Sequence, residues 1–132
     1  MAKFVTAAEA VQQIKDGSML ATSGFVGGLL AEAVLKEIQA SFKANGTPKD
    51  LSIVYAAGQG DSGERGLNHL GEEGLMKRII GGHFNLSPRL GELINNNKVE
   101  ATTCRRVRFP NGSAISRAAV PARLPKSAPY LR

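Results

Sequence analysis

Two glycine-rich segments have the residue types and spacing that could do chemistry in this chain of 132 residues. The first, residues 23–28, reads Ser-Gly-Phe-Val-Gly-Gly and follows the short apolar run 19–22. Its glycines let backbone amides approach an anion, and the helical pattern that follows would add the positive end of a helix dipole. The segment is therefore a candidate ligand loop, and the alternative is a tight strand-to-helix turn that binds nothing.

The second segment, residues 58–63, matches the pattern G-x-G-x-x-G directly after a strand-like run. Dinucleotide binding also needs a helix that starts at the glycines and an acidic residue roughly 20 positions further on. Here Gly66 stands where that helix should begin, and His83 stands where the acid should be. We therefore interpret the segment as a mobile loop that borders another kind of active site.

The remaining reactive side chains give no catalytic or metal-binding constellation. His69 and His83 have no Cys, Asp or Glu partner at ligand spacing, so both are predicted to be loop or packing histidines. The Glu72-Glu73 pair reads as a solvated helix start, because adjacent helical residues point to different sides. Cys104 lies beside arginines that would lower its pKa, but no base accompanies it. No catalytic residue and no metal site is predicted.

Charge divides the chain near position 101. Residues 1–101 hold all eleven acidic residues and ten of the seventeen Lys and Arg, for a formal charge of −1. Residues 102–132 hold seven basic residues, no acid and four of the six prolines. The prediction is an α/β domain over 1–101 and a basic, proline-containing tail over 102–132, whose charge alone makes the chain basic.

The body alternates helix and strand patterns. Thr6 and Glu9 form a capping box for a helix that should end at Gly17. Strands are predicted at 19–22, 51–56 and 98–101, helices at about 30–44 and 88–95, and a helix passing into a strand over 72–80. This order is typical of an open, mainly parallel α/β sheet with flanking helices, whose ligands bind at the carboxyl ends of the strands.

The N-terminus shows no signal peptide and the apolar runs are shorter than the ~20 residues of a membrane span. A single cysteine, Cys104, excludes an intrachain disulfide framework. These features predict a soluble, cytoplasmic protein.

An ordered series of blocks between Lys3 and Ala101 resembles the family I coenzyme A transferases, in particular the acetate/propionate branch. The blocks are 16–28, 55–61, 65–69, 73–75, 80–83 and 100–101. After Gly28 the family continues to a proline and a glutamate, of which only the acid, Glu32, is present here.

The resemblance implies transfer of CoA between short carboxylic acids through a glutamyl-CoA thioester. The glutamate that forms the thioester lies in the second half of the family's chain and has no match here. The resemblance also implies no cofactor, with acyl-CoA as a substrate of the full-length family. The partners that it implies for a complete enzyme are acyl-CoA, short carboxylates and a homo-oligomer or missing second half. The residues implied as acyl-site loops are Gly24, Phe25, Val26, Gly27, Gly28, Gly58, Gln59 and Gly60.

The resemblance stops at Ala101. The family continues Ala-Tyr-Asn-Leu-Pro-Gln-Gly, whereas residues 101–107 read Ala-Thr-Thr-Cys-Arg-Arg-Val. Codons for the family sequence, with one T deleted after the alanine codon, encode Ala-Thr-Thr-Cys-Arg-Arg and begin the next codon as valine does. Residues 120–127 give a second family-like match in the same shifted frame. We therefore expect that a frameshift truncated the protein, and that the fragment is inactive alone.

Two alternatives remain open. The chain could be a subunit of a two-chain CoA-transferase whose partner carries the glutamate. It could instead be a small nucleic-acid-binding protein that uses Arg105, Arg106 and Arg108 to neutralise phosphates. The tail has few aromatics and no recognised motif, so nucleic-acid binding is the weaker expectation.

Overall fold

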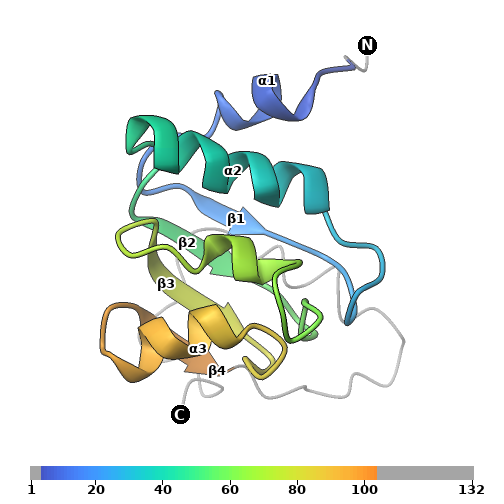
Figure 1. The fold of residues 1–132 in the computed structure, drawn as a ribbon, viewed down its shortest axis with the longest axis vertical. Helices are drawn as coiled ribbons and strands as arrows, with labels where there is room; N and C mark the ends of the chain where they lie inside the picture. The colour runs from blue at the N-terminus through green and yellow to red at the C-terminus, as the bar shows by residue number, and fades with distance from the viewer. Residues whose placement is uncertain (1–3, 104–132) are drawn as a thin grey trace, which may run out of the picture.

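The computed structural model describes residues 4–103. Their core is a four-stranded, fully parallel sheet in the order β1-β2-β3-β4, with β1 at Met19–Ala21, β2 at Leu51–Val54, β3 at Met76–Gly81 and β4 at Glu100–Thr103 (Figure 1). The helices are α1 at Ala7–Val11, α2 at Glu32–Asn45 and α3 at Pro88–Asn95, with a 3₁₀ helix, η1, at Leu67–Leu70. The predicted α/β class and parallel sheet are confirmed.

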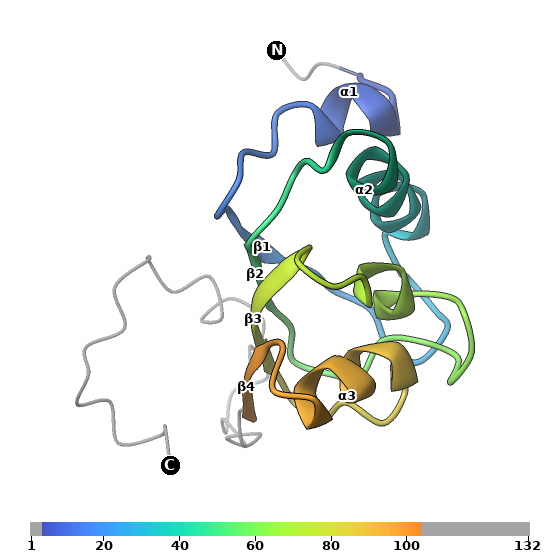
Figure 2. The ribbon, with the colours of Figure 1, turned by 60° about the vertical axis from the view of Figure 1, so that its left-hand side comes forward.

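All connections lie on one side of the sheet. Each strand pairs with the next one along the chain, and crossovers of one hand that move steadily in one direction stay on one face. Figure 2 shows α2, η1 and α3 on that face. Helix α1 packs against the side of α2 that faces away from η1 and α3. No helix of residues 4–103 covers the opposite face.

The core lies between the sheet and these helices. Leu20, Ile53 and Ile79 are paired in register across β1, β2 and β3, and the latter two are completely buried. Leu35 and Ile38 of α2 and Leu90 of α3 belong to the same cluster. Burial of these side chains, each stabilising by roughly 1.5–3 kcal/mol, holds the helical layer on the sheet.

Two element predictions were wrong in detail. The first helix ends at Val11 and not at Gly17, because the next backbone bonds span three residues, as in Ile14 N–H to Val11 O (2.9 Å). No helix begins at Glu72, because the segment is bounded by Gly71 and by Gly74, whose φ of 87° ends helical geometry. The helical turn of this crossover is instead η1, four residues long.

Strand β4 extends two residues past the predicted boundary at position 101, since Thr102 and Thr103 pair with Ile80 and Gly81. The tail prediction otherwise falls on residues 104–132, which lie outside the described residues, as do Cys104 and the arginines of the nucleic-acid alternative. The division into body and tail stays a prediction. Within the described chain no helix is long and apolar enough to cross a membrane.

Candidate functional site

The two glycine loops lie side by side at the carboxyl ends of β1 and β2, as predicted from the strand pattern. Val26 donates its N–H to the carbonyl of Gly58 (2.9 Å), and Gly60 donates to the carbonyl of Val26 (2.9 Å). The structure therefore brings together the two segments, residues 23–28 and 58–60, that the sequence indicated separately.

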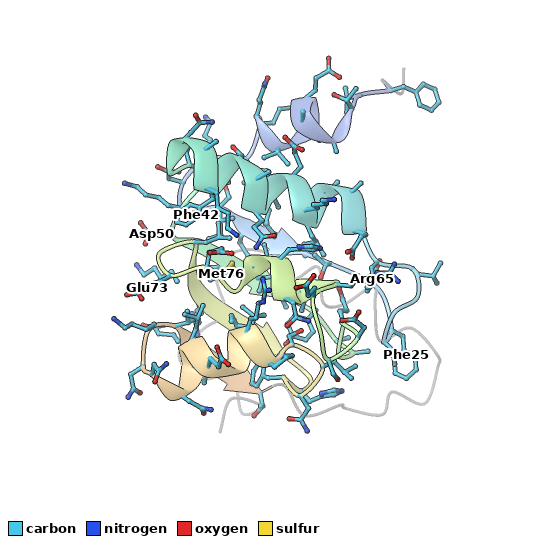
Figure 3. All side chains as sticks on the ribbon, viewed as in Figure 1. Phe25, Phe42, Asp50, Arg65, Glu73 and Met76 are labelled. Atoms are coloured by element: carbon cyan, nitrogen blue, oxygen red, sulfur yellow. The ribbon has the colours of Figure 1, made fainter. Side chains whose placement is uncertain are left out.

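The first loop is a narrow turn with an exposed apolar tip. Phe25 and Gly28 exchange both backbone hydrogen bonds (3.1 and 2.9 Å), and Val26 lies in the left-handed region at φ 53°. Phe25 is 63% exposed and Leu29 is 94% exposed. Figure 3 shows Phe25 at the outer side of this loop, away from the sheet. The turn thus presents apolar surface and not only backbone.

The amides of this loop differ from the predicted anion cradle. The N–H groups of Phe25, Val26 and Gly28 already donate to backbone carbonyls. Helix α2 begins only at Glu32, and its N-cap Ala31 provides no side-chain hydrogen bond. Anion binding through those three amides is therefore not available in this conformation, and contact through side-chain and glycine Cα surfaces is the better fit.

The second loop, residues 58–60, is held in place by buried polar contacts. Gln59 is 1% exposed, and its amide accepts from the Thr22 hydroxyl (3.0 Å) and donates to the Thr22 carbonyl (3.2 Å). Its own carbonyl accepts from the Ser87 hydroxyl (2.8 Å). The side chain of Gln59 therefore ties the loop to the end of β1, and its backbone carbonyl ties it to the α3 entrance, so any role in ligand contact would fall to its neighbours.

Gly60 and Gly66 are the positions of the 58–66 segment where a positive φ and a close backbone neighbour both require glycine. Gly60 has φ 148°, and a Cβ there would collide with the carbonyl oxygen of Leu86. Gly66 has φ 67° and lies so close to Gly60 that a Cβ would be 2.9 Å from its Cα. The element that directly follows residues 58–63 is the short 3₁₀ helix η1, not the α-helix that a dinucleotide-binding turn needs.

A polar cluster behind the loops was missed by sequence reasoning. His69 Nε2 lies 2.8 Å from Glu32 Oε1, and His69 Nδ1 lies 2.9 Å from Gln39 Oε1. His69 thus has a carboxylate partner, although none stood at ligand spacing. Glu32 and Gln39 are seven residues apart on α2, so they lie two turns apart on one face of the helix. Two polar residues on a helix face that also carries core residues were the sequence signal for this cluster.

Other candidate residues have structural partners. Glu72 binds Lys43 (2.9 Å) and accepts from Gln39, and Glu73 binds Lys98 (2.8 Å), so the pair is not a free dicarboxylate site. The Tyr55 hydroxyl donates to the His83 carbonyl (3.1 Å), and burial raises the pKa of that phenol. Residues 4–103 contain no cluster of three or more His, Cys, Asp or Glu that could hold a metal ion.

A shallow groove lies at the opposite end of the sheet. It has a volume of about 610 Å³ and is lined by residues that include Met76, Lys77, Lys98 and Glu100, where β3 and β4 begin. Since ligands of open parallel sheets bind at the carboxyl ends of strands, this groove is not the expected site.

Sequence comparison finds relatives among CoA-transferases. The chain is 39% identical over 98 residues to acetate CoA-transferase YdiF of Escherichia coli (strain K12), in a match that covers 74% of this chain and 18% of that protein. It is 33% identical over 99 residues to caffeate CoA-transferase of Acetobacterium woodii, in a match that covers 75% of this chain and 19% of that protein. The chain spans about a fifth of the length of these curated relatives. No protein-family model matches it.

The structure agrees with the sequence comparison. The apoenzyme of acyl-CoA transferase YdiF from E. coli O157:H7 superposes with a TM-score of 0.71 at 36% identity, over 76% of this chain and 20% of that chain. A variant of the decarboxylase AibA/AibB, with a TM-score of 0.55 at 20% identity over 76% of this chain and 38% of that chain, shares the fold alone. Over about three quarters of its length, this chain is therefore a relative of the family I coenzyme A transferases.

Proposed function

We propose that residues 4–103 form the loop wall of the acyl site in an acyl-CoA:carboxylate CoA-transferase acting on short carboxylic acids. The observation that carries this proposal is the pairing of the 23–28 and 58–60 loops through Val26 at the carboxyl edge of the sheet. Open parallel sheets bind their ligands at that edge. The relatives named as CoA-transferases and the YdiF structure described as a thioester complex with CoA support the same function.

The covalent chemistry requires a carboxylate that the loops do not supply. A glutamate attacks the acyl carbonyl of acyl-CoA, which releases CoA thiolate and leaves an acyl-glutamyl anhydride. The thiolate then attacks the glutamyl carbonyl, which releases the first carboxylate and leaves a glutamyl-CoA thioester. The second carboxylate reverses these steps to become the new acyl-CoA. Glu32, the acid bonded to the 58–66 segment, is already engaged by His69 and Gly66. Because the glutamate that forms the thioester in the family has no match in this sequence, we assign the nucleophile to a residue outside this chain.

Gly27 is the position that best fits a direct ligand contact. A Cβ there would meet no atom within 4 Å, so the fold does not need glycine at this point. A ligand that approaches the backbone closely would need it. The exposed side chains of Phe25 and Val26 flank this position and offer the apolar surface that a short acyl chain would contact.

The first experiment measures CoA transfer by the purified 132-residue chain from acetyl-CoA or propionyl-CoA to a second short acid. We expect no transfer, and no glutamyl thioester that hydroxylamine or borohydride can detect. A thioester on any glutamate of the chain would contradict the assignment of the nucleophile.

The second experiment restores one nucleotide after the Ala101 codon, with the downstream gene intact. The longer chain should transfer CoA between short acids, and Gly27→Val should abolish most of this activity without loss of folding stability. Gly91→Ala, in α3 and with nothing within 4 Å of its Cβ, is the matched control and should keep full activity. A folded longer chain without transfer, or an active Gly27→Val variant, would refute the proposal.

A further inference from the structure

Glu32 connects the two glycine loops from behind. It is the first residue of α2, the helix that follows the 23–28 loop, and its side chain is 30% exposed. One carboxylate oxygen, Oε2, accepts from the N–H of Gly66 (2.9 Å), and the other, Oε1, lies 2.8 Å from His69 Nε2. The first residue of the helix that follows the 23–28 loop therefore holds the end of the 58–66 segment.

The contact at Gly66 is passed on to both loops through the backbone. Gly66 forms an antiparallel bridge with Gly60, and Gly60 donates its N–H to the carbonyl of Val26. The path from Glu32 through Gly66 and Gly60 to Val26 closes a ring, because the chain itself runs from Val26 to Glu32. The other contacts in this ring are made by the backbone, so the hydrogen bond to the Glu32 carboxylate is the one that a side-chain substitution can remove.

Two side chains of α2 hold the His69 ring in place. Gln39 Nε2 donates to Glu72 Oε1 (2.6 Å), and Lys43 also binds that oxygen (2.9 Å). The amide oxygen of Gln39 then faces His69 Nδ1, while the carboxylate of Glu32 faces Nε2. Both ring nitrogens are therefore engaged by side chains of the helix that carries Glu32.

Other charged side chains lie around this contact. Arg65 lies 3.8 Å from Glu32 Oε1, His69 follows on the other side, and the next groups are Glu72 and Lys43. Figure 3 shows Arg65 near the start of α2. Burial raises the pKa of Glu32, but the hydrogen bonds from His69 and Gly66 and the charges of His69 and Arg65 outweigh it and lower that pKa.

We propose that Glu32, oriented by its contact with His69, is a positioning residue that holds the 58–66 segment against the 23–28 loop. It does not touch substrate, and it acts through the backbone of Gly66 and Gly60. Only the purpose of this arrangement rests on the proposed function, because the coupling itself can be measured without CoA.

The test uses ¹⁵N NMR of the 132-residue chain. Glu32→Gln preserves the size of the side chain but gives His69 Nε2 an amide in place of a carboxylate. Amide exchange at Gly60 and Gly66 should accelerate about tenfold or more, as expected for loss of a charge-assisted hydrogen bond. The Tyr55 amide, bonded to Ile80 O in the sheet, should exchange at its original rate.

Glu37→Gln is the matched control, because it removes the same charge from the same helix. Glu37 forms no hydrogen bond or ion pair with another residue in the described part of the chain. Equal exchange rates in Glu32→Gln and Glu37→Gln would refute the proposal, and so would an equal acceleration at Tyr55, since that is general unfolding.

The unsubstituted chain gives a second measurement if Glu32→Gln does not fold. The pKa of Glu32 is lowered, so its carboxylate becomes protonated only as pH falls below the usual value of 4.5, and protonation weakens its hydrogen bond from Gly66. Over that range the protection of the Gly66 amide, taken relative to its intrinsic exchange rate at each pH, should fall before that of the Tyr55 amide. Protection of Gly66 that falls no earlier than that of Tyr55 would refute the coupling. Neither outcome depends on CoA transfer, so this inference and the proposed function can fail separately.

Discussion

The imidazole ring of His83 lies against Gly58 so closely that a Cβ on Gly58 would overlap its Cε1 and Nε2 atoms. Gly58 follows β2 and His83 follows β3, so the contact joins the carboxyl ends of neighbouring strands. The carbonyl of His83 also accepts from the Tyr55 hydroxyl, which holds this backbone in place. The second glycine loop is thus packed from the β3 side by a ring and from the α2 side by a carboxylate.

Gly58→Ala should destabilise the protein by about 1–3 kcal/mol, because the added methyl must displace the His83 ring. Urea denaturation would measure the change. His83→Ala removes the obstructing ring, so the double variant should lose less stability than the sum of the two single variants. Strict additivity would show that the contact does not constrain Gly58.

Gly60→Ala should cost more than Gly17→Ala, although both residues have positive φ. At Gly17, with φ 74° and open space, the cost is the left-handed conformation alone, about 1–2 kcal/mol. At Gly60 the backbone must also move away from the Leu86 carbonyl. Denaturation midpoints of the two variants give the comparison, and equal losses would contradict the packing of this loop.

Gly91→Ala should stabilise the protein by about 0.5–1 kcal/mol. Gly91 lies within α3, and its Cβ position is open, so alanine removes conformational freedom from the unfolded chain without a clash. Thermal unfolding would detect the gain. A loss of stability would mean that the α3 backbone is not the regular helix described.

At acid pH, Glu32 and Glu72 should lose the contribution that their paired carboxylates make to the free energy of unfolding. The hydrogen bond from Lys43 lowers the pKa of Glu72 despite burial, and the contacts described above lower that of Glu32. A lowered folded-state pKa gives stability that is complete above the usual value of 4.5 and is lost as pH falls through the folded-state value. Urea midpoints of the parent should therefore fall below pH 4.5 more steeply than those of Glu72→Gln. Parallel curves would contradict the Glu72 pairing.

The sequence was sufficient to predict the sheet but not the contacts behind its loops. Strand β2 has a β-branched centre, and Pro88 starts α3 at the predicted residue, because these signals are local. The pairing of Glu32 with His69 joins residues 37 positions apart and depends on α2 packing against η1, which no local pattern encodes. The helix predicted at Glu72 was wrong because flanking glycines outweighed the helical composition.

For the proposed acyl-site residues too, the sequence predicted the position of the loops but not the contacts of each side chain. The proximity of Gly24–Gly28 to Gly58–Gly60 followed from parallel topology, since both segments end neighbouring strands. The parallel topology did not predict which side chains of these loops are buried and which are exposed to solvent. Gln59 is buried because Thr22 and Ser87 bond to it, whereas Phe25 is exposed. The role of these loops in binding stays a prediction.

The strand order β1-β2-β3-β4 also has a consequence for biosynthesis. A ribosome releases the chain from its N-terminus, and here every strand joins the edge left by the strand made just before it. No strand has to wait for a later one to fill a place between them, which is the requirement that slows the folding of sheets with distant pairings. The sheet can therefore grow in step with translation, one strand and its crossover at a time.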